Sequence, residues 1–509
     1  MTEVASRRLI AGLYALPIVC AALAAAFYSQ FLLTHDSSWY LIATRKFLEG
    51  QRLYLDIIEI NPPLNFYLTV PALVLADIIQ ISDTLSYTLF YCALAGASTL
   101  WAARLLERSD LANGDRLLFL VVGLVGLFLL PISEFTQREH IMLIFALPYF
   151  YLSIIGRDRA SIGVFEQFAM GLVAALGLAL KPYFLLIPLA LLLAGPSREI
   201  FKRAFFPANL GLALGLVLYA LFVLVFHFEY FTQIVPIATR VYGDFGLSWQ
   251  TVLFRSEAVA LFFLVLLVLW TRNSLDQVGR SLVAGTLGAL AVYLIQFKGW
   301  NYQALPFSFF TALSALWIAH SRRSFARRET AVLFLVMGAV IFAIGPQLKR
   351  GPYDTKMVSP FASFIEAPAP RILVYSTNVS AGFPFTNAVG GQWSSRFPAQ
   401  WLIPGALIGL QETECGAKPK TCNDLTGILG AARDANTEDF LRNRPDYVFA
   451  DERKNKSYFG GLAFNYIDFM KDDPRFAQAW SNCRRIGAVE RFQYGVWRCD
   501  TAKISEPAE

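Results

Sequence analysis

Charged residues are scarce in this sequence. Asp, Glu, Lys and Arg make up 16% of the 509 residues, whereas hydrophobic residues make up 56%. Soluble domains typically contain about 25% charged and about 45–50% apolar residues. The composition therefore excludes an ordinary soluble protein, and the net charge of +6 is too small to indicate a nucleic-acid partner. We expect a protein that spans a membrane.

Several catalytic signatures are also missing. The sequence contains no Walker loop and no GxGxxG, HExxH or GxSxG motif, which argues against nucleotide hydrolysis, dinucleotide redox chemistry, zinc proteolysis and the usual serine hydrolases. From residue 347 onward there is also no apolar run of the about 20 residues that cross a bilayer as a helix. We predict a transmembrane domain at 1–346, with a first outer loop at 34–83, and a soluble domain at 347–509.

The apolar runs of the first domain predict a polytopic α-helical membrane protein with about eleven transmembrane helices. Basic residues gather in every second connection, and such connections stay in the cytoplasm. Arg7 and Arg8 therefore place the N-terminus there, and the odd number of spans places the C-terminal domain outside. The short apolar segment 64–80 contains Pro71 and Asp77 and is interpreted as an interfacial or re-entrant helix. The predicted spans are 9–33, 84–106, 115–131, 140–156, 163–180, 183–196, 207–227, 251–271, 281–296, 303–320 and 330–346.

Two strand-like segments and four cysteines characterise the C-terminal domain. "RILVYST" from residue 371 and "DYVFAD" from residue 446 are short apolar segments bounded by turns, which predicts a mixed α/β fold. Cys415 is close to Cys422, and Cys483 to Cys499; close pairs suit disulfides in an oxidising compartment, but the sequence leaves the pairing open. The aromatic segment 390–405 suits a structural loop better than a site where glycans stack.

The segment "HDSSWYLIATRKFLEGQRLYLDIIEINPPLNFYL" is unusually polar for its position directly after the first apolar run. Asp36 or Ser37 is suited to cap a helix at 38–49 that ends at Gly50. The apolar face of this helix predicts that it lies flat on the membrane. Capping alone is one explanation for Asp36, and chemistry at the membrane edge is the other. Further residues of this segment are assigned to a substrate loop: His35, Tyr40, Asp56, Glu59, Pro62 and Pro63.

Four further polar groups fall on the same predicted side of the membrane. One of them, "SEFTQREH", ends in Glu139 and His140. Ionisable residues at membrane depth are costly unless they pair or serve a site, although an interfacial ion cluster and belt aromatics are the simpler explanations. Carboxylates suit proton transfer, and Lys and Arg suit phosphate. The residues that we assign to phosphate binding are Arg138, Lys181, Arg240, Lys298 and Tyr302.

With these motifs the membrane domain resembles the GT-C superfamily of membrane glycosyltransferases, which includes protein O-mannosyltransferases and aminoarabinose transferases. The similarity rests on an Asp at the start of the first outer loop, a turn with Gly50, Tyr54 and Asp56, and a Pro-Pro-Leu sequence. "QREH" stands where the family carries its second acidic motif, with Glu in place of the usual Asp. The resemblance implies catalytic roles for Asp36, Glu139 and His140.

What the resemblance implies is an enzyme that moves a sugar from a polyprenyl-phosphate donor to an acceptor hydroxyl. The reaction would invert the sugar and take place on the periplasmic side of a bacterial inner membrane. Because phosphate leaves as a stabilised anion, Asp36 would suffice as the general base. No cofactor is certain, and a divalent metal is possible. The sugar is open, and the acceptor is a lipid-linked molecule, a glycan or a protein. Alternatives are a transporter or flippase of lipid-linked sugars, a glycan polymerase or ligase of the same superfamily, and a non-catalytic assembly subunit.

Overall fold

The computed structural model describes residues 3–156, 161–241, 248–253, 275–321 and 351–504, with single positions at 330, 334, 338 and 349. The described chain is mostly helical and forms two compact units. Unit 1 comprises Met1–Gln30, Leu75–Phe222 and Gly246–Pro352, and unit 2 comprises Phe31–Val74, Val223–Phe245 and Tyr353–Glu509. The C-terminal part of the chain therefore shares a unit with most of the predicted outer loop. The predicted boundary between residues 346 and 347 does not include this association.

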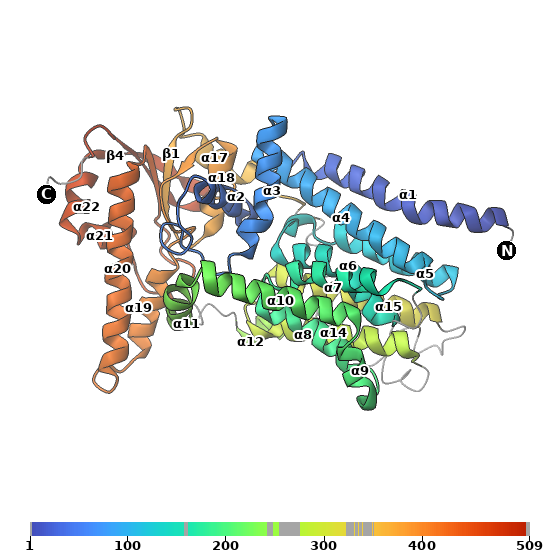
Figure 1. Ribbon diagram of the computed structural model, residues 1–509. Coiled ribbons are helices and arrows are strands. Elements are labelled where there is room, and N and C mark those ends of the chain that lie inside the picture. The colour runs from blue at the N-terminus through green and yellow to red at the C-terminus, as the bar shows by residue number, and fades with distance from the viewer. Residues whose placement is uncertain are drawn as a thin grey trace. The chain divides into compact units, whose positions relative to one another are not determined.

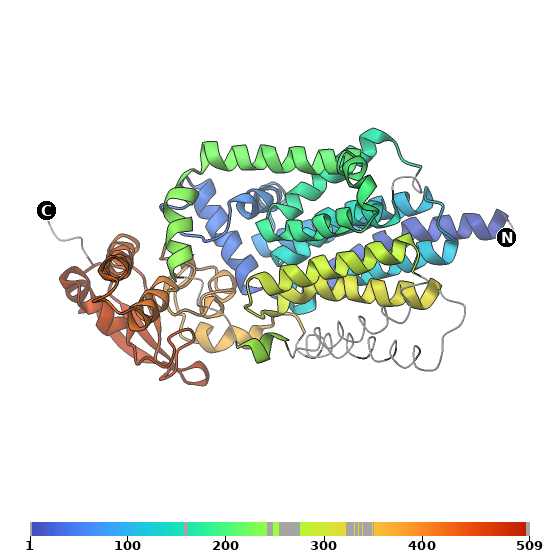
Figure 2. The same cartoon turned by 90° about the horizontal axis from the view of Figure 1, so that it is seen from below.

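Unit 1 is a bundle of apolar helices, several of which run in nearly the same direction (Figures 1 and 2). The helices from α1 to α15, including two that reach into unit 2, are α1 (Glu3–Tyr28), α3 (Leu64–Ile79), α4 (Asp83–Glu107), α5 (Asn113–Leu124), the π-helix η1 (Val125–Leu129), η2 (Ile132–Glu134), α6 (Arg138–Ile155), α7 (Val164–Leu178), η4 (Pro182–Leu185), α8 (Leu186–Leu193), η5 (Ser197–Glu199), α9 (Ile200–Ala204), α10 (Pro207–Phe226), α12 (Trp249–Leu253), α14 (Gln277–Ile295), η8 (Asn301–Ala304) and α15 (Leu305–Ser321).

Six helices in the described ranges are long and apolar enough to cross a membrane, and a bent helix pair brings the number to seven. This confirms a helical protein of the membrane type. Two of the predicted spans, 251–271 and 330–346, lie almost entirely outside the described residues. Other predicted spans form shorter apolar helices, such as α7 with 15 residues. The six are Ala11–Tyr28, Asp83–Glu107, Arg138–Ile155, Pro207–Phe226, Gln277–Ile295 and Asn301–Ser321.

Glycines allow α7 to approach two neighbouring helices closely. A Cβ atom on Gly177 would lie 2.8 Å from the carbonyl oxygen of Met142 in α6, and Gly171 and Gly211 each face the backbone of the other's helix where α7 crosses α10. Apolar helices in a membrane commonly associate through close backbone contact at small residues. The hydrophobic effect does not drive this association, because lipid is as apolar as the helix surfaces. The contact at Gly177 brings the end of α7 toward the start of α6.

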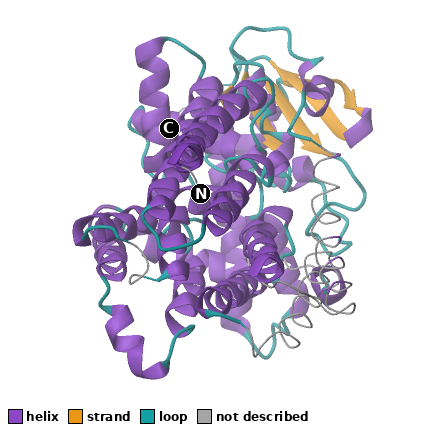
Figure 3. Cartoon of the chain, turned by 90° about the vertical axis from the view of Figure 1, so that its right-hand side faces the viewer, coloured by secondary structure: helices purple, strands orange, loops and turns teal. Residues whose placement is uncertain are grey.

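Unit 2 contains one small mixed sheet (Figure 3). Its order is β2-β1-β3-β5-β4, with β1 parallel to β2 and β3, and with β5 antiparallel to β3 and β4. The two segments predicted as strands form β1 and β3, which confirms the mixed α/β fold. The strands are β1 (Arg371–Tyr375), β2 (Gln392–Trp393), β3 (Tyr447–Asp451), β4 (Cys483–Val489) and β5 (Tyr494–Cys499).

The other elements of unit 2 are helical. They are α2 (His35–Leu48), the π-helix η6 (Tyr230–Ile234), α11 (Val235–Val241), η9 (Thr355–Met357), α17 (Ser359–Ala362), η10 (Val379–Ala381), α18 (Phe385–Ala388), α19 (Leu402–Glu412), α20 (Pro419–Asn443), α21 (Tyr466–Lys471), α22 (Pro474–Trp480) and η11 (Glu490–Phe492).

Both faces of the central strands are buried, which explains why their sequences are continuously apolar. Because side chains alternate along a strand, Leu373 and Tyr375 belong to one core with α19 to α22, whereas Ile372 and Val374 belong to a second core. This second core also contains residues of α2, including Trp39.

The helix α2 packs within unit 2 instead of presenting its apolar face to lipid. The Trp39 ring lies 5.5 Å from that of Phe383, and the Lys46 ammonium donates to the carbonyl of Ser395 at 3.1 Å. Protein and not lipid therefore covers the Trp39 side of this helix, in contrast to the apolar face that we assigned to the membrane. A stripe of apolar side chains looks the same in sequence whether protein or lipid covers it.

The cysteine pairs of unit 2 form two disulfides, Cys415–Cys422 and Cys483–Cys499. The second joins the paired strands β4 and β5 at directly opposed positions. In the aromatic segment 390–405, Trp393 and Trp401 are buried in the two cores, so this segment is the structural loop that the sequence favoured.

Candidate functional site

Asp36 lies in the first turn of α2, but it does not cap the helix. The cap is Thr34, whose extended backbone precedes the helix and whose hydroxyl oxygen accepts from the N–H of Ser37 at 3.3 Å. The alternative that Asp36 is only a helix cap is therefore wrong, whereas the predicted end at Gly50, which has a φ of 95°, is confirmed. The position still favours a carboxylate, because the positive end of the helix dipole stabilises negative charge there.

Asp36 has an imidazole and a phenol nearby within unit 2. His35 Nε2 lies 3.6 Å from an oxygen of Asp36, and His35 Nδ1 lies 2.7 Å from the Tyr353 hydroxyl. The side chains of His35 and Asp36 are 26% and 21% exposed. Asp36 is thus a solvent-accessible carboxylate beside a histidine. Tyr353 follows 318 residues after His35, and no local sequence signal connects the two.

Two acidic residues of the predicted substrate loop have structural contacts. Asp56 accepts from the backbone N–H of Arg52 at 2.9 Å, which is the main cause of the lowered pKa of its carboxyl group. Glu59 is buried and accepts from the Trp39 indole at 2.9 Å and from the backbone N–H of Asn61 at 3.1 Å. These contacts shape the turn and join it to α2.

The remaining residues of that loop pack around the start of α3. Tyr40 is buried with its ring 5.1 Å from that of Phe66. Pro62 is half-buried and Pro63 is buried, and the carbonyl of Pro63 accepts from the N–H of Phe66 as α3 begins at Leu64. This arrangement suits a rigid support for α2 better than direct contact with a substrate.

Unit 1 contains a second charged group, which we call the cation cluster: Arg138, Glu139, Lys181, Lys298 and Tyr302. The Lys181 ammonium donates to Glu139 Oε1 at 2.6 Å, and both side chains are almost fully buried, at 5% and 0% exposed. The same ammonium lies 5.0 Å from the centre of the Tyr302 ring. Three segments that the sequence separates widely thus meet in one place.

Positive charge exceeds negative charge in the cation cluster. Lys298 lies in the connection between α14 and η8, where burial and the nearby charges of Lys181 and Arg138 lower its pKa to about 7. Its ammonium lies 4.9 Å from the centre of the Trp300 ring. Within the described part of the chain, Glu139 Oε2 is buried without a hydrogen-bond donor. Lys and Arg side chains that lie close together are suited to contact an anion such as phosphate.

His140 has a structural position. Its Nδ1 accepts from the backbone N–H of Thr136 at 3.0 Å, so the proton is on Nε2, which lies 2.8 Å from the carbonyl of Leu127 in η1. In an α-helix that carbonyl would accept from residue 131, but Pro131 has no N–H. Both ring nitrogens are engaged by the backbone, which is the geometry of a positioning residue and not of a proton carrier. The spacing of Leu127 and Pro131 is the sequence signal for this contact.

Arg240 belongs to unit 2 and not to the cation cluster of unit 1. It lies in α11, where its guanidinium is 3.1 Å from Asp424 of α20. This ion pair gives Arg240 a structural partner, and the phosphate-binding role stays a prediction.

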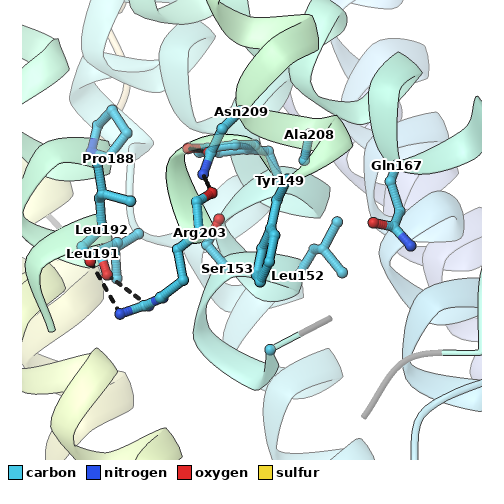
Figure 4. Close-up of a pocket in the computed structure, with 12 residues that line it drawn as sticks. Tyr149, Leu152, Ser153, Gln167, Pro188, Leu191, Leu192, Arg203, Ala208 and Asn209 are labelled. Atoms are coloured by element: carbon cyan, nitrogen blue, oxygen red, sulfur yellow. Dashed lines mark hydrogen bonds between the residues drawn. The ribbon is translucent and has the colours of Figure 1, made fainter. Parts of the chain in front are cut away.

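A small polar pocket of about 50 Å³ lies elsewhere in unit 1 (Figure 4). Arg203 donates to the carbonyls of Leu191 and Leu192 at 2.9 and 3.0 Å, and so caps the end of α8. Tyr149 donates to Asn209 at 2.7 Å. The pocket holds at most a few water molecules, and Tyr149, Arg203 and Asn209 already have hydrogen-bond partners. We interpret it as a structural joint.

Among the described residues, no group of three His, Cys, Asp or Glu side chains is placed to hold a metal ion. No family model matches this chain, and no curated protein sequence matches it significantly.

Proposed function

We propose that this protein is an integral membrane glycosyltransferase of the GT-C type. It transfers a sugar from a polyprenyl-phosphate donor to an acceptor hydroxyl on the periplasmic side of a bacterial inner membrane. The proposal includes about eleven spans, a cytoplasmic N-terminus and a periplasmic unit 2, for which the two disulfides are suited. The observation that carries it is the buried Glu139–Lys181 pair with Arg138 and Lys298 beside it.

The cation cluster is suited to bind the donor phosphate. Ionisable side chains that a membrane protein buries usually pair with one another or serve a site. The ammonium groups of Lys181 and Lys298 would lie next to the phosphate oxygens of the bound donor. They would also stabilise the negative charge that builds up on the phosphate as it leaves. Contacts of this kind are strong in an environment that excludes water.

Asp36 is assigned the role of general base. It would accept the proton of the acceptor hydroxyl while the oxygen attacks the anomeric carbon and the bond to the phosphate breaks. This single displacement inverts the configuration at the anomeric carbon of the sugar. Because the phosphate leaves as an anion, no acid is needed at the leaving group, in contrast to glycosidases, which use two carboxylates. His35 lies next to this carboxylate, with Nε2 3.6 Å from an oxygen of Asp36.

The direct test is sugar transfer by the purified protein in lipid vesicles. Labelled polyprenyl-phosphate sugars are supplied with an extract of cell-envelope acceptors, and covalent transfer is measured. In parallel, movement of the labelled lipid between leaflets is measured without acceptor. Transfer of one sugar supports the proposal. Transfer of whole glycan chains favours a polymerase or ligase, leaflet exchange without transfer favours a flippase, and neither activity favours an assembly subunit.

Phosphate binding should depend on pH through Lys298. Its pKa is near 7, so the side chain is a charged ammonium below that pH and a neutral amine above it. Donor affinity is therefore expected to fall as pH rises from 6 to 8, and Lys298→Met should show weak binding without that fall. Binding of a fluorescent polyprenyl phosphate, measured across this range, checks the prediction. A fall of equal size in Lys298→Met would assign the titration to another group.

A further inference from the structure

A crevice in unit 2 is lined by residues to which no role has been assigned so far. Its volume is about 420 Å³, within the range of small-molecule sites. It lies where the parallel strands β1 and β3 end: Asn378 and Ser380 follow β1, and Arg453 to Asn455 follow β3. The crevice outside the carboxyl ends of parallel strands is where open α/β sheets usually bind ligands.

The charges that line this crevice are all positive. Three cations and no carboxylate contribute to its wall: Arg453, Lys454 and Arg491. Arg453 is held in place by Asp451, which it contacts through two hydrogen bonds of 2.9 and 2.6 Å. Lys454 and Arg491 are exposed, and neither forms an ion pair with another described residue. The crevice therefore has positive charge available for an anion.

The remaining lining suits a sugar. Phe361 and Phe492 stack with their ring centres 5.7 Å apart, and Tyr494 lies edge-on to Phe361 at 5.4 Å. Phe361 and Tyr494 are buried, so the half-buried Phe492 is the ring that can meet the apolar face of a sugar. The polar side chains among the lining residues are neutral donors and acceptors suited to hydroxyl groups: Asn378, Ser380, Asn455 and Gln493.

We propose that this crevice binds an anionic saccharide, a sugar that carries a carboxylate or a phosphate group. Lys454 and Arg491 contact the charged group, and Phe492 contacts the ring. A free inorganic anion would leave the aromatic and amide lining unused, and a neutral sugar would leave the cations unused. The inference does not depend on the transferase reaction, because it rests on residues of unit 2 that have no role in that reaction.

The test is equilibrium binding to the purified full-length protein in detergent. The probes are digalacturonate and glucose 1-phosphate, compared with glucose and inorganic phosphate. We expect at least one anionic sugar to bind about tenfold more tightly than both glucose and phosphate, because only the anionic sugar contacts both the cations and the ring and amide lining. The proposal is overturned if inorganic phosphate or glucose binds as tightly as the anionic sugars. It is also overturned if neither anionic sugar binds.

Variants locate the binding. Lys454→Gln and Arg491→Gln should each weaken the anionic sugar about tenfold. Arg484→Gln removes an exposed cation of β4 that does not line the crevice and should leave binding unchanged. Thermal unfolding of all three proteins checks that the fold is kept. If Arg484→Gln weakens binding as much as the other two, the effect comes from the overall charge of unit 2 and the crevice is not the site.

Discussion

Asp36→Asn is expected to lower the rate of sugar transfer by about 10²–10⁴-fold, the usual contribution of a general base. Asparagine has nearly the same shape as aspartate and keeps an acceptor oxygen, but it cannot take up a proton at neutral pH. Because Thr34 caps α2 and Asp36 does not, the substitution should leave the cap of the helix intact and the protein folded. Transfer measured at equal protein abundance, together with thermal unfolding, checks both statements.

Thr34→Ala is the matched control. It removes the hydroxyl that accepts from Ser37 and should lower stability by about 1 kcal/mol while transfer continues. Loss of activity in Asp36→Asn with a normal fold supports the base assignment. Full activity in Asp36→Asn would remove Asp36 from the mechanism and leave the cation cluster as the only candidate centre.

Local pattern predicted some of the elements of this fold. Long apolar runs predicted helices such as α4 and α14, and two short apolar segments predicted β1 and β3. The sequence did not predict which part of the protein, or whether lipid, covers each element. The apolar stripe of α2 was assigned to lipid, but Trp39 packs in a core with the sheet, because a stripe records burial and not the material that buries it.

For the candidate residues too, the sequence identified single side chains but not the contacts between them. The cost of burying charge in an apolar segment identified Lys181 and Glu139 separately, and the structure places them 2.6 Å apart. Local sequence did not choose between neighbouring capping residues, so Thr34 was missed in favour of Asp36. It also gave no sign of Tyr353, because a contact between residues 318 positions apart is decided by the packing of the whole unit.

The Glu139–Lys181 pair allows stability and function to be separated. Glu139→Leu should leave the Lys181 ammonium buried without its carboxylate, and Lys181→Met should leave the carboxylate buried without its cation. Removing one partner of a buried pair typically costs about 3–5 kcal/mol, because the remaining charge is unpaired. Replacing both partners by apolar side chains of similar size is often nearly neutral. The midpoint of thermal unfolding should therefore fall in both single variants and recover in the double variant.

Transfer activity should not recover with stability. If the cation cluster binds the donor phosphate, the double variant folds but has lost one of its cations, and its affinity for the donor stays low. The control is a neutral buried pair between α14 and α15, the hydroxyls of Thr286 and Ser314 at 2.9 Å. Removing both as Thr286→Val with Ser314→Ala should change stability by about 1 kcal/mol and leave donor binding intact. If the Glu139→Leu, Lys181→Met double variant instead regains both stability and transfer, the ion pair only joins α6 to the turn after α7, and the phosphate must be bound elsewhere.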